Sequence, residues 1–107
     1  MPDNLFDLHG KTALITGGNG GIGLGIANGF AESGANIAVA GRNTTKTEKV
    51  VADLCERNTS AIGIEVDVAN QESVEDMITN TLEAFGQIDI LVNNAGIGIR
   101  NLPHEYN

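Results

Sequence analysis

Thr16-Gly17-Gly18-Asn19-Gly20-Gly21-Ile22-Gly23 is the stretch of this 107-residue sequence that decides its fold. It follows a short run rich in β-branched residues, 12–16, and opens a longer segment of helical period. Glycines between a strand and a helix let the backbone approach a pyrophosphate, whose charge the helix N-terminus stabilises. Glycines also serve purely structural turns, but this context favours a dinucleotide-binding site. Spacing alone does not choose between two overlapping patterns, Gly18-x-Gly20-x-x-Gly23 and Gly17-x-x-x-Gly21-x-Gly23.

Outward from this turn, short apolar runs alternate with segments of helical period. The pattern predicts strands over 12–16, 36–40, 61–66 and 88–92, with a helix in each interval. Such alternation is typical of an α/β fold, here a Rossmann-type doubly wound parallel sheet. Right-handed crossovers place the strands, numbered along the chain, in the order 3-2-1-4. We expect residues 1–107 to form one dinucleotide-binding domain, the N-terminal half of such a sheet, truncated on its C-terminal side.

The three expected helices each carry an apolar stripe and end signals. The first ends at Ser33-Gly34, and its core face is predicted to be Ile22, Ile26, Ala27, Phe30 and Ala31. The second fits a capping box at Thr45-Lys46-Thr47-Glu48, and its buried stripe is predicted to be Val50, Val51, Leu54 and Cys55. The third is capped by Asn70, ends at Gly86, and is predicted to bury Val74, Met77, Ile78, Leu82 and Phe85.

Composition excludes several classes of function. A formal charge of -8, with 14 acidic residues against 6 basic ones, argues against nucleic acid as a partner. The single cysteine, Cys55, excludes an intrachain disulfide and a thiolate metal cluster, so we predict no metal site. The sequence has no apolar run of membrane-spanning or signal-peptide length. We therefore expect a soluble, cytoplasmic protein with no membrane partner.

Ligands of doubly wound sheets bind where the winding reverses, at the carboxyl ends of the strands. The glycine stretch and Asn93-Asn94-Ala95-Gly96 are both delivered there. After the second strand, no Asp or Glu occurs between Glu32 and Glu48, whereas Arg42 could meet a ribose 2′-phosphate. A solvated loop arginine is the alternative. Asp67 and Asn94 end the third and fourth strands, where they could instead cap a turn or hold the loop together.

The motifs Thr16-Gly17-x-x-x-Gly21-Ile22-Gly23, Asp67-Val68 and Asn93-Asn94-Ala95-Gly96, in this order and spacing, resemble the short-chain dehydrogenase/reductase family. The resemblance selects the register Gly17, Gly21, Gly23. It implies that 17–23 hold the pyrophosphate, Arg42 the adenosine phosphate, and Asp67 and Val68 the adenine. Residues 99–106 resemble sugar-acid dehydrogenases of the gluconate and deoxygluconate type. The predicted cofactor-binding residues are Gly17, Asn19, Gly20, Gly21, Ile22, Gly23, Arg42, Asn43, Asp67, Val68, Asn94, Ala95 and Gly96.

The resemblance implies an NAD(P)-dependent oxidoreductase that transfers a hydride between the nicotinamide and a small alcohol or carbonyl substrate, a sugar acid being one candidate. Arg42 favours NADP, with NAD as the alternative. The family's catalytic Ser and Tyr-x-x-x-Lys would lie beyond Asn107. We therefore predict no catalytic residue in this chain and no activity from it alone. A non-catalytic dinucleotide-binding module and a structural fragment are the other readings. We expect the isolated chain to associate or aggregate, because the apolar edge of its fourth strand would be paired with a fifth strand in the full sheet. The complete enzyme is expected to be a homo-oligomer.

Overall fold

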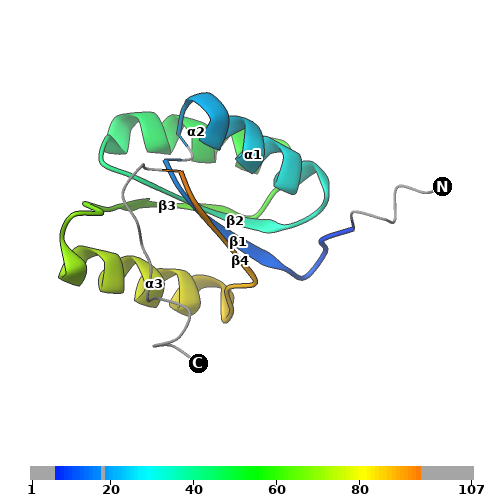
Figure 1. Ribbon diagram of the computed structural model, residues 1–107. Helices are drawn as coiled ribbons and strands as arrows, with labels where there is room; N and C mark the ends of the chain where they lie inside the picture. The colour runs from blue at the N-terminus through cyan, green and yellow to red at the C-terminus, as the bar shows by residue number, and fades with distance from the viewer. Residues whose placement is uncertain (1–6, 18, 95–107) are drawn as a thin grey trace.

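The computed structural model describes residues 7–17 and 19–94, and these form a parallel sheet with helices on both faces. The elements are β1 (Thr12–Thr16), α1 (Gly21–Glu32), β2 (Asn36–Gly41), α2 (Thr44–Glu56), β3 (Ala61–Glu65), α3 (Gln71–Phe85) and β4 (Ile90–Asn93). All neighbouring strands are parallel, in the order β3-β2-β1-β4. Helices α1 and α2 lie on one face and α3 on the other (Figure 1). The predicted doubly wound α/β fold and its strand order are confirmed.

The central strands are buried on both faces, which explains their continuous apolar runs. Every residue of β1 is buried, Thr12 and Thr16 included. Because side chains alternate along a strand, Leu14 contributes to the core under α3, while Ala13 and Ile15 contribute to the core under α1 and α2. The two cores therefore position the carboxyl ends of the strands at one common edge.

The strand ends differ slightly from the predicted ones. Strand β2 continues through Gly41, and β3 ends at Glu65 rather than at residue 66. Strand β4 begins at Ile90 instead of residue 88, since its pairing with β1 starts at Ile90 opposite Ala13. It extends to Asn93, which pairs with Thr16 of β1.

The cap of α2 is a correction. The predicted capping box from Thr45 is wrong, because α2 starts at Thr44 and its N-cap lies two residues before Thr45. Asn43 is the N-cap: it has an extended backbone, and its side chain accepts a hydrogen bond from the Lys46 N–H at 3.0 Å. Thr45 therefore lies inside the first turn, where it cannot act as a cap. The predicted cap of α3 is confirmed, since the Asn70 side chain accepts the Ser73 N–H at 3.0 Å, and Gly86 ends that helix in the left-handed conformation.

Three residues predicted to be buried are exposed. Ile22 is 76% exposed, because α1 begins at Gly21 and its first turn has no core beneath it. Cys55 is exposed, since α2 turns a face built on Thr47 and Leu54 toward the sheet and Cys55 falls beside that face. Leu82 is 36% exposed, because the buried face of α3 is built on Val74, Met77, Ile78 and Thr81 and Leu82 falls beside it.

Two threonines are buried where the apolar pattern did not predict burial. Thr81 of α3 is fully buried, and its hydroxyl donates to the Met77 carbonyl at 2.9 Å. Thr47 of α2 is 2% exposed. Each hydroxyl has a partner, which lets a threonine occupy a core position on a helix.

Candidate functional site

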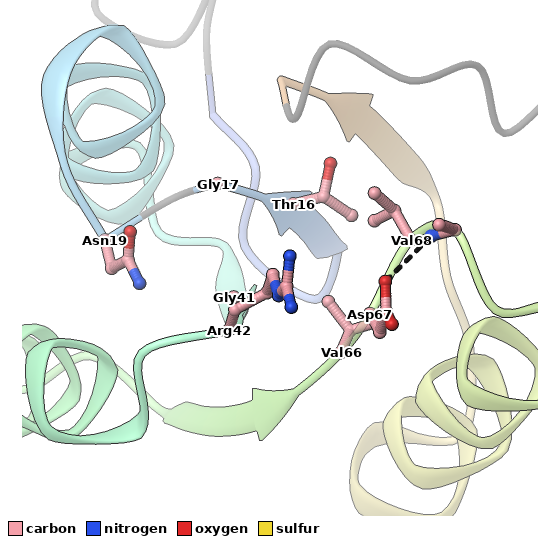
Figure 2. A pocket seen from close by; sticks show the side chains of 9 residues that line it. Thr16, Gly17, Asn19, Gly41, Arg42, Val66, Asp67 and Val68 are labelled. Atoms are coloured by element: carbon pink, nitrogen blue, oxygen red, sulfur yellow. Dashed lines mark hydrogen bonds between the residues drawn. The ribbon is translucent and has the colours of Figure 1, made fainter.

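A pocket of about 280 Å³ opens at the carboxyl ends of β1, β2 and β3 (Figure 2). Five predicted site residues line it: Gly17, Asn19, Arg42, Asp67 and Val68. The remaining lining residues were not predicted; they are Thr16, Gly41, Val66 and Ala69. These four directly precede or follow predicted site residues, so their position at the strand ends was the only signal that could have found them.

The N-terminus of α1 differs from those of the other two described helices. Its N-cap is Gly20, which has no side-chain cap hydrogen bond. By contrast, asparagine side chains cap α2 and α3. The turn before α1 requires glycine at two predicted positions, since Gly17 and Gly21 have φ angles of 71° and 55°. Backbone N–H groups at an uncapped helix N-terminus form an anion-binding site, and here that N-terminus follows directly after Asn19, which lines the pocket.

Gly23 allows the glycine turn to pack closely against the end of β4. A Cβ atom built on Gly23 would lie 2.1 Å from the Gly17 carbonyl oxygen and 2.7 Å from Asn94 Nδ2. The Asn94 N–H donates to two oxygen atoms of Thr16, the carbonyl at 3.2 Å and the hydroxyl at 3.1 Å. These contacts fit the structural role that the sequence left open for Asn94.

Arg42 is exposed and extends from the end of β2 toward the pocket (Figure 2). Within residues 7–17 and 19–94, no carboxylate forms an ion pair with its guanidinium group and no acceptor hydrogen-bonds to it. A second hollow, lined by Arg42, Glu65, Val66, Asp67 and Ser73, adjoins the first. Arg42 is therefore the cation of the site, available for an anionic ligand.

Asp67 is fixed by hydrogen bonds to the turn that follows β3. Its carboxylate accepts the Ala69 N–H at 3.0 Å, drawn as the dashed line in Figure 2, and its own N–H donates to the Ser73 hydroxyl at 2.9 Å. The turn-capping role considered for Asp67 is thus present. The bond from the Ala69 N–H holds the Asp67 carboxylate in place, and Asp67 lines the pocket.

The other predicted residues lie around the pocket or outside the described part of the chain. Gly20 is the N-cap of α1 and Gly21, Ile22 and Gly23 begin that helix, but none of the four is among the residues that line the pocket. Asn43 is not among the lining residues, and its side chain is engaged as the α2 cap. Ala95, Gly96 and the stretch 99–106 lie outside the described residues. In the described segments, no three His, Cys, Asp or Glu side chains cluster as a metal site would require, and no helix is long and apolar enough to span a membrane.

The fold and the pocket together define a dinucleotide-binding α/β protein, and the comparisons with known proteins specify its family. The family model described as short chain dehydrogenase matches residues 11–107, so the chain belongs to the short-chain dehydrogenase family. The resemblance inferred from the motifs is confirmed.

Individual relatives agree with this assignment. The chain is similar to a 3beta-hydroxysteroid dehydrogenase 2 of Eggerthella lenta, with 42% identity over 90% of this chain and 37% of the relative. It is 37% identical to a 2-dehydro-3-deoxy-D-gluconate 5-dehydrogenase of Formosa agariphila, over 96% of this chain and 39% of the relative. A crystal structure of a short chain dehydrogenase/reductase from Burkholderia phymatum in complex with NAD superposes with a TM-score of 0.77 at 30% identity, over 79% of this chain and 30% of that structure. The chain thus spans less than two-fifths of the length of these relatives.

Proposed function

We propose that the full-length protein is an NAD(P)-dependent oxidoreductase and that this chain carries its cofactor-binding half. The observation that carries the proposal is the uncapped N-terminus of α1 beside a pocket built from the ends of three parallel strands. Family membership supports the same conclusion. When bound, the nicotinamide of the cofactor supplies or accepts the hydride, and an alcohol or carbonyl compound is the other reactant.

Each part of the site has a role in holding the dinucleotide. Residues 17–23 bind the pyrophosphate through backbone N–H groups, which the helix dipole of α1 assists. Asp67 and Val68 lie at the adenine end of the pocket. Asn94, Ala95 and Gly96 are proposed to bind the adenosine ribose and the part of the cofactor that leads to the nicotinamide.

The preferred cofactor is NADP(H). A carboxylate at the end of β2 would repel a 2′-phosphate, but residues 33–47 contain no acid, and Arg42 lies at the pocket. A guanidinium group makes charge-assisted hydrogen bonds to a phosphate. Because Arg42 is exposed to solvent, we expect only about a tenfold preference over NAD(H).

The substrate is proposed to be a sugar acid or a similar hydroxylated compound. The resemblance of 99–106 to sugar-acid dehydrogenases supports this class, as does the similarity to the Formosa relative. Oxidation rates of the full-length enzyme with aldonic acids, simple sugars and hydroxysteroids would rank the candidates. Turnover restricted to hydroxysteroids would refute the sugar-acid assignment.

Location and assembly complete the proposal. The single cysteine and the ordinary globular composition fit the cytoplasm, where thiols remain reduced. The complete enzyme is proposed to be a homo-oligomer. Strand β4 lies at the sheet edge among the described strands, which supports self-association of this chain when it is isolated. A monodisperse monomer by light scattering at tens of micromolar would contradict the latter.

The decisive experiment compares Arg42→Ala with Arg57→Ala in the full-length protein. Both variants remove one positive charge, but Arg57 lies at the opposite end of α2, where it is bonded to Asp53 and Asn28. Arg42→Ala is expected to weaken NADP(H) binding about tenfold and leave NAD(H) binding nearly unchanged, while Arg57→Ala changes neither. Fluorescence titration measures the dissociation constants of both cofactors for each variant. Equal losses for the two cofactors, or tighter binding of NAD(H) by the unmutated protein, would refute the NADP assignment.

A further inference from the structure

Thr47 lies at an unusual junction of the fold. It belongs to the first turns of α2 and does not line the pocket, yet it is only 2% exposed. Its γ-methyl group packs against β3: a Cβ atom built on Gly63 would be 2.8 Å from that methyl carbon. Its hydroxyl points the other way and accepts a hydrogen bond from Asn19 Nδ2 at 3.1 Å. One buried side chain therefore connects β3 to the glycine turn.

The hydrogen bond that Asn19 donates to Thr47 holds the Asn19 carboxamide over the end of β2. A Cβ atom built on Gly41 would lie 2.5 Å from Asn19 Nδ2 and 3.4 Å from the Thr47 hydroxyl oxygen. The carboxamide thus occupies the space that a side chain at position 41 would need. Gly41 directly precedes Arg42, and both line the pocket with Asn19 (Figure 2). The wall between the glycine turn and Arg42 is therefore built by Asn19, which Thr47 orients.

The start of α2 contacts the glycine turn at a second point. A Cβ atom on Gly20 would lie 3.0 Å from the Lys46 ammonium nitrogen. Residues 46 and 47 of α2 therefore touch residues 20 and 19 of the turn. Glycine-rich turns lose much conformational freedom when they bind a ligand, and a turn held in place beforehand loses less.

We propose that Thr47 is a positioning residue for the cofactor: its buried hydroxyl fixes Asn19 over Gly41 and thereby shapes the pocket beside Arg42 that receives the adenosine phosphate. This inference rests on the proposed function, because it concerns the same pocket. It adds a residue that contacts no ligand and acts only through Asn19. Without the hydroxyl, the Asn19 carboxamide loses the hydrogen bond that holds it over Gly41.

Two substitutions at position 47 separate this role from simple packing. Thr47→Val keeps the methyl group against β3 and removes the hydroxyl. Thr47→Ser keeps the hydroxyl and removes the methyl group. In the full-length protein, the valine variant is expected to bind NADP(H) about fivefold more weakly at an unchanged melting temperature. The serine variant is expected to bind as the unmutated protein does while melting about 3 °C lower.

A combined variant tests whether Thr47 acts through Asn19. If it does, adding Thr47→Val to Asn19→Ala should cause no further loss of NADP(H) affinity, because the Thr47 hydroxyl then has no carboxamide to orient. The side-chain amide resonances of Asn19 give a readout that needs no cofactor. They should shift in Thr47→Val and stay in place in Thr47→Ser.

The outcomes discriminate between this inference and the proposed function. If the unmutated protein binds NADP(H), Arg42→Ala weakens it, and Thr47→Val binds normally, then only the positioning role is refuted. It is also refuted if affinity follows melting temperature in both position-47 variants, or if the Asn19 amide signals do not move. If the unmutated protein binds no dinucleotide, the proposed function and this inference are refuted together.

Discussion

Replacing Gly23 by alanine is expected to damage the glycine turn far more than the same change elsewhere in α1. The new Cβ atom would lie 2.1 Å from the Gly17 carbonyl oxygen and 2.8 Å from the Gly17 carbonyl carbon, both of them backbone atoms. A flexible side chain could rotate away, but this carbonyl belongs to the residue that follows β1. The turn must therefore move by about 1 Å, and Gly17 cannot move independently because its N–H is bonded to the Ala40 carbonyl at 2.8 Å.

The size of the effect follows from two opposing terms. Overpacking a well-packed site costs up to about 3 kcal/mol, and a backbone contact lies at the upper end of that range. Alanine in place of glycine inside a helix returns about 1 kcal/mol. The net expectation for Gly23→Ala is a free energy of unfolding lower by about 2 kcal/mol.

Gly25→Ala is the matched control, because a Cβ atom there meets nothing within 4 Å. In the same helix it should raise the free energy of unfolding by about 0.5 to 1 kcal/mol. Urea unfolding followed by circular dichroism measures both variants, and the midpoint of Gly23→Ala should fall about 1 M below that of the unmutated protein. If Gly23→Ala unfolds at the same midpoint as Gly25→Ala, the close contact between α1 and the turn is not what restricts position 23.

Two further predictions concern the α2 cap and the amino-terminal end of the sheet. Asn43→Ala should lower the free energy of unfolding by about 1 kcal/mol, whereas Thr45→Ala should change it by less than about 0.5 kcal/mol; a larger loss at Thr45 in urea unfolding would contradict the observed cap. The pKa of Asp89 is held below its usual range, first by the Thr12 N–H at 2.8 Å, then by the Gln87 side chain and the charge of Lys11. A carboxyl with a depressed folded pKa stabilises the fold above its unfolded value, near 4, and that stabilisation is lost as pH falls through the folded pKa. Asp89→Asn should therefore have a lower urea midpoint than the unmutated protein at pH 7, with the difference shrinking at pH 3; a difference that is constant with pH would contradict this reasoning.

Local patterns in the sequence determined the element types, their order and the location of the site. The periods of apolar residues separate strands from helices, and parallel crossovers of one hand leave few topologies. Residues that directly follow strands, such as Gly17 and Arg42, could be predicted at the pocket because all strands of a parallel sheet end at the same edge. The start of α3 could be predicted from Asn70 for a similarly local reason, because an N-cap side chain bonds within the first turn of its own helix.

Tertiary structure alone decided which face of each helix is buried and which distant residues touch. Thr47 is buried and Cys55 exposed because α2 rotates to match β3, and no property of the helix sequence by itself sets that rotation. The bond between Asn19 and Thr47 joins residues 28 positions apart, and the two side chains fill the space over Gly41 only in the folded structure. The period of apolar residues shows which side of a segment is apolar. Burial and close approach depend instead on the shape of the particular surface that each segment meets.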